Sequence, residues 1–257
     1  MKPLALAVAL TIPWLWSCDQ TTEPSEAGQD ASQSTTLSSA SLTEQLNRSP
    51  HFDPNNFVRT VDNPLFPLRP GTRYVFEGEE DGEIETNVTI VTHDRKSILG
   101  IRATVVLDRV FVRGELKEKT FDWYAQDKQG NVWYLGENTK EYEDGEVVST
   151  EGSWQAGRDG AKAGIIMLAH PRVGDSYRQE FLAGEAEDQS RVVATDIDQR
   201  VPYGSFDHCV RTVEFTPLEP GVKEAKIFCP VVGFVRAHGV EGPATRLVLT
   251  HITRVAR

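Results

Sequence analysis

Short runs of alternating apolar and polar residues dominate the chain from about residue 63 onward. The longest run places Ile101, Ala103 and Val105 on one face, with polar residues between them. A period of two is typical of β-strands, and turn-forming pairs such as Asp144-Gly145 separate the runs. We therefore predict strands at residues 72–78, 83–93, 98–112, 115–126, 131–136, 141–142, 146–150, 176–182, 191–195, 208–215, 224–229, 233–237 and 246–255.

This spacing predicts an all-β fold. An antiparallel meander of such strands forms a curved half-barrel, a barrel or a sandwich. We expect one β domain over residues 61–257. Residues 71–77 and 174–180 share Gly, Tyr and Glu at a shift of 103 positions, which indicates two duplicated β units, 64–160 and 170–257. Chance similarity between β-rich stretches remains the alternative.

Residues 152–168 depart from the alternating pattern. They are rich in Gly and Ala and end in an apolar run, Ile165-Ile166-Met167-Leu168. Long irregular connections often act as lids or binding loops. We favour the other interpretation, in which this segment connects the two halves and Trp154 and residues 165–168 fill a core.

The first seventeen residues are typical of an export signal. Lys2 precedes an apolar stretch, residues 3–16, which is shorter than the ~20 residues that a membrane span needs. Leu15-Trp16-Ser17-Cys18 resembles a bacterial lipobox. We therefore expect residues 1–17 to be a lipoprotein signal peptide and Cys18 to be the lipidated N-terminus, because the Ala-x-Ala sites at 5–7 and 7–9 come too early for ordinary cleavage.

Residues 18–60 then form the expected lipidated cysteine and disordered tether. Up to residue 50 they are mainly Ser, Thr, Gln, Glu and Ala, a composition that buries too little apolar surface to fold. Only residues 41–46 are predicted to be helical. We expect a protein of the bacterial cell envelope, anchored by its lipid to a membrane and facing the periplasm or the exterior.

Composition narrows the class of protein and of partner. Hydrophobic residues make up 39% and charged residues 25% of the chain, as in soluble globular proteins rather than multi-span membrane proteins. The formal net charge is −11. Nucleic acid is therefore not an expected partner, because phosphate binding needs clustered Lys and Arg.

Two of the three cysteines are placed to form a disulfide. Residue 219, in a turn-forming stretch, lies midway between Cys209 and Cys229, so two strands folded about it bring these cysteines face to face. An oxidising compartment favours their disulfide over two buried thiols. The same register sets Glu214 opposite Glu224, a like-charge pair that counts against it.

The sequence contains no recognisable catalytic or metal-binding constellation. In Asp207-His208-Cys209, neighbouring strand residues point to opposite faces, so His208 and Cys209 are not expected to form a nucleophilic pair. The six histidines lack the spacing of a metal site. We expect no catalytic residues, no metal and no cofactor.

Aromatic residues are the remaining candidates for ligand binding. They could line a cavity, although aromatic side chains on paired strands more often fill a core. These candidates are Trp123, Tyr124, Trp133, Tyr134 and Trp154.

Several local signatures together resemble a family of bacterial secreted proteins and lipoproteins that has no assigned activity. The resemblance covers most of residues 60–236 and is most specific in Trp-Tyr-Ala-Gln-Asp, residues 123–127, followed by Gly-Asn-Val-Trp-Tyr, residues 130–134. It implies an exported β-rich domain and supplies no catalytic residues. Many relatives lack a cysteine at position 229. The other matching segments are 63–71, 152–154, 173–177 and 201–206.

Together these features favour a non-enzymatic, membrane-tethered β domain that binds an apolar small molecule or an envelope protein. The first alternative is an envelope hydrolase whose site is assembled from distant residues. Converging carboxylates or a His–Asp pair in a pocket would favour it. The second alternative is a purely structural envelope protein with a filled core.

Overall fold

The computed structural model describes residues 52–80 and 82–254. The expected signal peptide, Cys18, residues 19–51 of the expected tether and the predicted helix at 41–46 lie outside the described residues. The last part of the predicted tether, residues 52–60, is ordered instead, because the Val58 backbone N–H donates to the Gln126 carbonyl of the domain at 2.9 Å. Within the described ranges no helix is long and apolar enough to cross a membrane. The described helical structure is one 3-10 turn, Pro54–Asn56, capped by the Asp53 carboxylate.

Fifteen strands lie within the described residues of the domain, and the all-β prediction is confirmed. In chain order they are β1 Thr72–Glu80, β2 Glu83–Ile98, β3 Ile101–Val112, β4 Glu115–Gln126, β5 Val132–Glu143, β6 Glu146–Ser149, β7 Trp154–Gln155, β8 Lys162–Met167, β9 Ser176–Arg178, β10 Glu180–Phe181, β11 Gln189–Val201, β12 Gly204–Phe215, β13 Lys223–Cys229, β14 Gly233–Glu241 and β15 Thr245–Arg254.

The strand positions follow the alternating pattern, with several differences. The predicted strand 176–182 is divided into β9 and β10, and the predicted strand 191–195 extends over 189–201 as β11. β2 runs on to Ile98, and the turn to β3 is made by Leu99 and Gly100, both with positive φ. β5 continues through two separately predicted strands. Residues 152–168 contain two short strands, β7 and β8, that their irregular pattern hid. Trp154 and Ile165–Met167 in this segment are buried.

The strands form one open antiparallel sheet with the order β10-β8-β5-β4-β3-β2-β1-β15-β14-β13-β12-β11-β9, and the short strands β6 and β7 each pair with β5 beside this path. It consists of two consecutive meanders joined where β1 pairs with β15. Its two ends are neighbours in sequence, because only Gln179 separates β9, which pairs with β11, from β10, which pairs with β8. The duplication itself stays a prediction.

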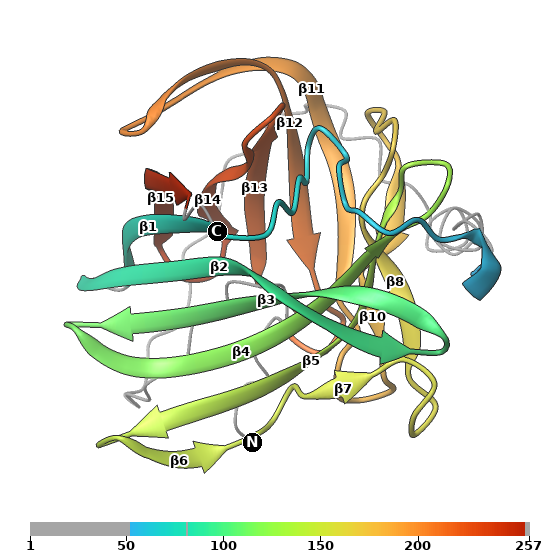
Figure 1. The fold of residues 1–257 in the computed structure, drawn as a ribbon. Coiled ribbons are helices and arrows are strands. Elements are labelled where there is room, and N and C mark those ends of the chain that lie inside the picture. Colours follow the sequence, from blue (N-terminus) through green and yellow to red (C-terminus); the bar gives the residue numbers. More distant parts are fainter. Residues whose placement is uncertain (1–51, 81, 255–257) are drawn as a thin grey trace, which may run out of the picture.

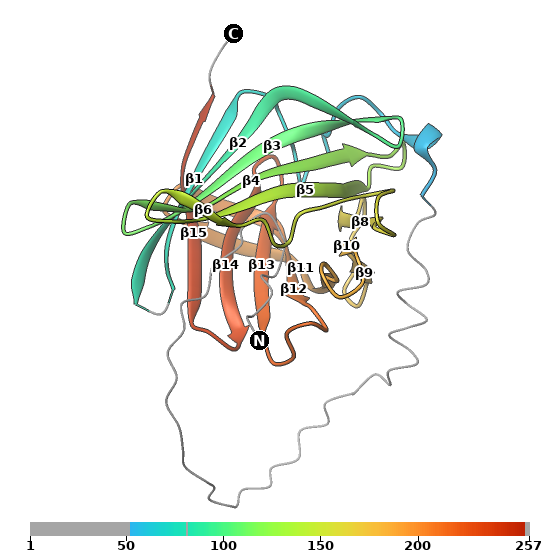
Figure 2. The ribbon, with the colours of Figure 1, turned by 90° about the horizontal axis from the view of Figure 1, so that it is seen from below.

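Strong curvature brings the two halves of the sheet face to face (Figure 2). Strands β1–β5 form one layer, and β11–β14 lie across from them. Residues 57–71, which we call the strap, run across the opening between the halves before entering β1 (Figure 1). The molecule therefore combines features of the predicted half-barrel and sandwich.

The strap is fixed to the sheet by buried side chains. The Gln126 side-chain carbonyl on β4 accepts the backbone N–H groups of Asp62 and Asn63, both at 2.8 Å. The Asn63 amide in turn donates to the carbonyl oxygens of Gly130, at 2.9 Å, and Leu168, at 3.1 Å. These contacts stabilise the strap across the opening, as expected where buried backbone groups need partners.

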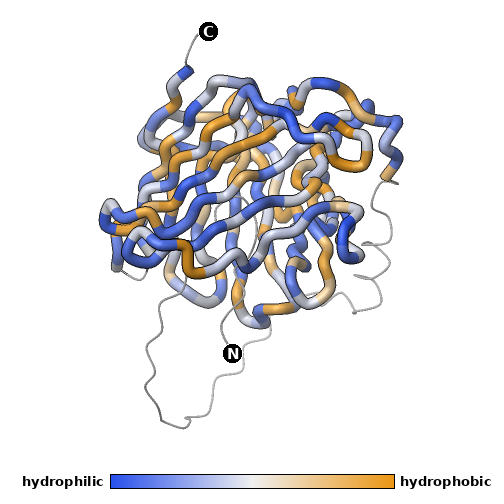
Figure 3. Tube along the Cα trace, turned by 60° about the horizontal axis from the view of Figure 1, so that its bottom comes forward, coloured by the Kyte–Doolittle hydropathy of each residue, from blue (hydrophilic) through white to orange (hydrophobic). Residues whose placement is uncertain are grey.

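The core is built from the apolar residues that alternate with polar ones along the strands. Figure 3 shows this alternation as hydrophobic and hydrophilic segments that follow one another along the chain. A large cluster extends over β3, β4, β5 and β8 and includes Tyr124, Tyr134 and Ile165. A smaller cluster around the cysteines joins β12–β15 to β1. Burial of this apolar surface is the main force that holds the halves together.

Candidate functional site

A half-open apolar pocket of about 80 Å³ lies between the two halves of the sheet. Strap residues form one side of it, β1–β4 and β8 contribute from the first half, and β13 and β14 contribute from the second. The lining residues are Phe66, Pro67, Leu68, Tyr74, Phe76, Thr89, Val106, Tyr124, Ile166, Lys226, Phe228, Val232, Gly233 and Phe234.

Aromatic rings from distant parts of the chain form the pocket wall. Phe66 of the strap meets Tyr124 of β4 edge-on, with ring centroids 5.2 Å apart. Phe234 contacts both Phe76, at 5.0 Å, and Phe228, at 5.7 Å. Edge-to-face and tilted ring pairs of this kind are favourable, so the wall has a defined shape.

The turn between β13 and β14 forms part of the rim. Val231 has a φ of 72°, an unusual value for a β-branched residue, and its side chain is 62% exposed. Its backbone N–H donates to the Pro64 carbonyl of the strap at 2.8 Å. Gly233 also has a positive φ, and a Cβ there would lie 3.2 Å from Pro67. Close strap contact thus favours glycine at this position.

A disulfide anchors the start of this turn. Cys209 and Cys229 are bonded, and the pairing of Val210 with Phe228 is the register predicted from the loop centre. Because Cys229 ends β13, directly before the rim turn, the disulfide ties the rim to β12.

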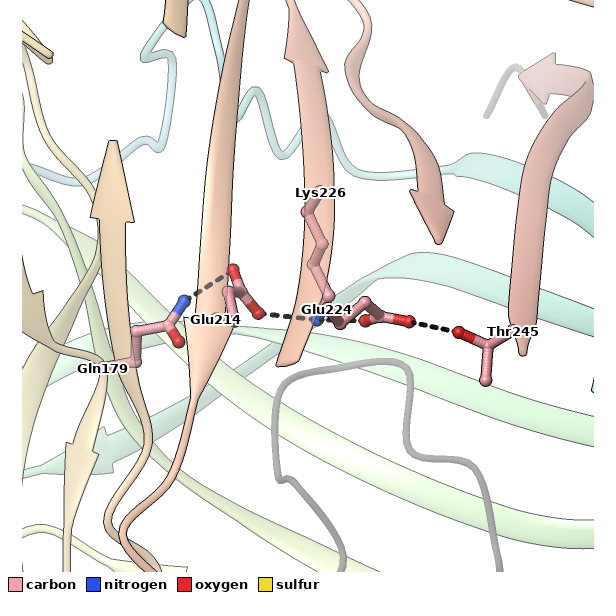
Figure 4. Close-up of polar contacts among 5 residues, drawn as sticks. All are labelled: Gln179, Glu214, Glu224, Lys226 and Thr245. Carbon is pink, nitrogen blue, oxygen red and sulfur yellow. Dashed lines mark hydrogen bonds and ion pairs between the residues drawn. The ribbon is translucent and has the colours of Figure 1, made fainter. Parts of the chain in front are cut away.

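Lys226 connects the pocket to a buried polar cluster. Its ammonium lies 2.8 Å from a Glu214 carboxylate oxygen and 3.6 Å from one of Glu224, and its side chain is only 2% exposed. The Gln179 amide donates to the second Glu214 oxygen at 2.9 Å, and the Thr245 hydroxyl donates to Glu224 at 3.4 Å. Figure 4 shows these groups as one line across β12 and β13.

The facing half of the sheet contributes further buried carboxyl groups. Asp108 accepts hydrogen bonds from Asn87, at 2.6 Å, and Thr89, at 2.8 Å, and burial raises its pKa to about 7. Asp122 accepts one from the Tyr134 hydroxyl at 2.7 Å. Burial, with the nearby Asp108 carboxylate adding to it, raises the pKa of Asp122 to about 8.

These groups belong to a continuous set that joins the two halves. Burial, followed by the charge of a neighbouring carboxylate, raises the pKa values of Glu137, Glu180 and Asp188 well above their ordinary range. For Glu137 that neighbour is Asp122, for Glu180 it is Asp188, and for Asp188 it is Glu214. Burial therefore favours the protonated form of these three groups. We call Asp108, Asp122, Glu137, Glu180, Asp188, Glu214 and Glu224 the interior carboxyl set.

The interior carboxyl set has little contact with solvent. Asp122, Glu180 and Glu214 are 0% exposed. Among the described residues, the buried atoms without a hydrogen-bond partner of normal geometry include both Glu180 side-chain oxygens and one oxygen of Asp188. No group of three or more His, Cys, Asp or Glu in residues 52–80 and 82–254 is arranged to hold a metal ion.

Of the five aromatic candidates, Tyr124 lines the pocket. Tyr134 stacks on Tyr124 with centroids 4.8 Å apart, and Trp154 packs edge-on against Tyr134 at 5.3 Å, so these two support the pocket wall from behind. Trp123 and Trp133 lie on the other face of β4 and β5. There Lys96 covers the Trp123 ring, and Phe52 contacts Trp133.

The Asp207-His208-Cys209 cluster is taken apart by the fold. Cys209 is in the disulfide, and His208 pairs with the Asp196 carboxylate instead. Both partners of this pair are exposed on the β11–β12 hairpin, where carboxylates raise the pKa of His208. The pair is not among the described lining residues of the pocket.

Most pocket residues and five of the seven members of the interior carboxyl set went unpredicted, and Glu214 and Glu224 were identified only as a like-charge pair in the disulfide register. Pocket residues Phe66 and Leu68 were noted only as part of a family signature. Thr120 and Asp122 alternate with the apolar residues Phe121 and Trp123, a signal of one polar strand face. Such a face normally contacts solvent, whereas here the curvature of the sheet turns it inward.

Comparisons with known proteins give two structural similarities. No family model and no curated protein sequence matches the chain. An exported-protein candidate from Bacteroides fragilis, described as having a YmcC-like fold, aligns with a TM-score of 0.46 and 15% identity over 74% of this chain and 99% of its own. A lipoprotein candidate from Parabacteroides distasonis aligns with a TM-score of 0.38 and 13% identity over the same shares.

Proposed function

We propose that this protein is a lipoprotein of the bacterial cell envelope whose β domain binds an apolar ligand between the halves of its sheet. In this proposal Cys18 carries the lipid anchor, residues 19–51 act as the tether, and the domain works by binding rather than by catalysis. The observation that carries the proposal is the half-open apolar pocket beneath the strap.

The dimensions of the pocket favour a flexible alkyl chain. An apolar cavity of about 150 Å³ holds one benzene molecule, and this pocket has a volume of about 80 Å³. It can therefore enclose the last few carbons of a chain, while the rest of the ligand extends through the open side. Phe66, Phe228 and Phe234 supply the apolar contacts for this end.

The polar groups near the pocket favour binding over hydrolysis. Lys226 is already paired with Glu214 and Glu224. Carboxylates do converge, which is the feature that would favour a hydrolase, but Asp122 and Glu180 lie in the closed interior with 0% exposure. A substrate would have no direct contact with them.

Export and lipidation are supported by the sequence of residues 1–18 and can be tested separately from ligand binding. Cells fed a labelled fatty acid should incorporate the label into the wild-type chain and not into Cys18→Ser. Equal labelling of the two chains would contradict the proposed anchor.

Native mass spectrometry of the chain carrying Cys18→Ser, purified without detergent, tests the ligand. This substitution removes the expected acylation site and leaves every described residue intact. We expect an adduct of lipid-like mass that organic extraction removes. Val232→Trp, at the rim of the pocket, should abolish the adduct.

Val240→Trp is the matched control, because Val240 is 56% exposed and is not among the described lining residues. It should retain the adduct. A bare wild-type protein, or an adduct equally abundant in both tryptophan variants, would contradict binding in this pocket.

A further inference from the structure

Two arginines flank the same end of the pocket. Arg69 directly follows Leu68, a lining residue of the strap. Arg254 of β15 pairs with Thr72 of β1. Two positions further along β1, Tyr74, which lines the pocket, pairs with Ile252. Paired residues share a face of the sheet, as do residues two apart. Arg254 therefore extends from the pocket face of the sheet.

Tyr74 marks the boundary between the apolar pocket and this basic end. Burial raises the pKa of its phenol, and the guanidinium groups of Arg254 and Arg69 act in the opposite direction, as expected for positive charges close to it. Tyr203, in the β11–β12 turn, is held nearby because its backbone N–H donates to the Leu249 carbonyl at 3.2 Å. Its side chain is 43% exposed.

Neither arginine has a carboxylate partner within the described residues. The ion pairs found there involve other groups, and both arginines are exposed. Lys226, the other cation at the pocket, differs because Glu214 and Glu224 already pair with it. An anionic group is therefore attracted to the two arginines rather than to Lys226.

We infer that the ligand is a single-chain anionic amphiphile, with its alkyl end in the pocket and its anionic oxygen headgroup between Arg69 and Arg254. This inference rests on the proposed function. Guanidinium groups bind phosphate and carboxylate oxygens through paired hydrogen bonds. The alkyl chain and the headgroup thus meet complementary surfaces, the apolar pocket wall and the two arginines beside Tyr74.

Calorimetric titration with three twelve-carbon probes below their micelle concentrations tests the inference. The probes are dodecyl phosphate, dodecanol and dodecylamine, and the protein is the full chain carrying Cys18→Ser. We expect dodecyl phosphate to bind about tenfold more tightly than dodecanol, the effect of one charge-assisted contact, and dodecylamine to bind most weakly. Inorganic phosphate alone should bind at least about a hundredfold more weakly than dodecyl phosphate, because it lacks the apolar contacts.

The double variant Arg69→Gln with Arg254→Gln should remove the preference for dodecyl phosphate and leave dodecanol affinity unchanged. Arg102→Gln, at an exposed position on β3, is the matched control and should behave like wild type.

Equal affinity for the phosphate and the alcohol, or a preference that survives the double variant, would overturn the inference while leaving apolar binding intact. Inorganic phosphate that binds as tightly as dodecyl phosphate would also overturn it. Failure of all three alkyl probes to bind would contradict the proposed function itself.

Discussion

Glu214 and Glu224 are directly opposite each other on β12 and β13, and both carboxylates contact the ammonium of Lys226. The like-charge pair that counted against the disulfide register is thus bridged by a cation two residues beyond Glu224. The disulfide register and this ion cluster belong to the same strand pairing, and Lys226 connects the pairing to the pocket.

Removing the Lys226 charge should destabilise the domain strongly. Lys226→Met leaves two carboxylates facing each other in a nearly dry site, and breaking such a buried cluster costs about 3–5 kcal/mol. Urea unfolding at pH 7 measures the change. Adding Glu214→Gln should recover part of the loss. Lys117→Met, which breaks an exposed pair with Glu115, is the control and should leave the free energy of unfolding nearly unchanged. Equal losses of stability in the two lysine variants would contradict a special role for the buried ion cluster.

The disulfide should stabilise both the domain and the pocket rim. Cys209→Ser with Cys229→Ser opens a loop of 20 residues, which corresponds to about 3 kcal/mol of unfolding free energy. Urea unfolding is measured for the oxidised wild type, the reduced wild type and the double variant. The reduced wild type and the double variant should unfold at the same urea concentration, below that of the oxidised wild type. An unchanged midpoint after reduction would contradict a structural role.

Stability should decrease as the pH rises from acid to neutral. Asp108, with a pKa of about 7, and Asp122, with one of about 8, hold protons in the folded state that the unfolded chain releases near pH 4. Their stabilising contribution is complete below about pH 4 and is lost as the pH passes the folded pKa values.

Asp122→Asn is nearly isosteric and should flatten the curve of unfolding free energy between pH 5 and pH 8. Asp144→Asn, in the exposed turn after β5, should leave the wild-type slope intact. The same slope in wild type and Asp122→Asn would show that Asp122 does not titrate in this range.

Glycine at position 164 is required by a close crossing of two backbones. A Cβ on Gly164 would lie 2.4 Å from the Gln179 carbonyl, where β8 passes the stretch that links the sheet ends. Gly164→Ala should cost about 3 kcal/mol or more, since neither backbone can yield easily. Gly204→Ala, whose Cβ would meet only the Phe206 ring at 3.7 Å, should stay within about 1 kcal/mol of wild type. Thermal unfolding of the two alanine variants measures the difference. Similar losses of stability in both would contradict a close backbone contact at Gly164.

Local patterns predicted the strands and the disulfide because both depend on nearby residues. Alternation identified β4 with its observed bounds, and the loop centre identified the Cys209–Cys229 pairing. No role was predicted for Lys226, although its spacing of two residues from Glu224 places both side chains on one face of the strand.

The pocket could not be read in the same way. Phe66 reaches Phe228 and Tyr124 only because the strap crosses the opening between the halves. Such contacts depend on how far the sheet curves, and no local period encodes that. The buried position of Asp122 has the same cause, because its strand face is polar by sequence and becomes interior only through curvature.

Methyl NMR of the Cys18→Ser chain during titration with dodecanol tests most directly whether the pocket is the ligand site. We expect chemical-shift changes concentrated at Leu68, Val106, Ile166 and Val232, which line the pocket, and none at the exposed Val147 and Val148 of β6. Unchanged pocket methyls, or changes as large at Val147 and Val148, would contradict binding in the pocket.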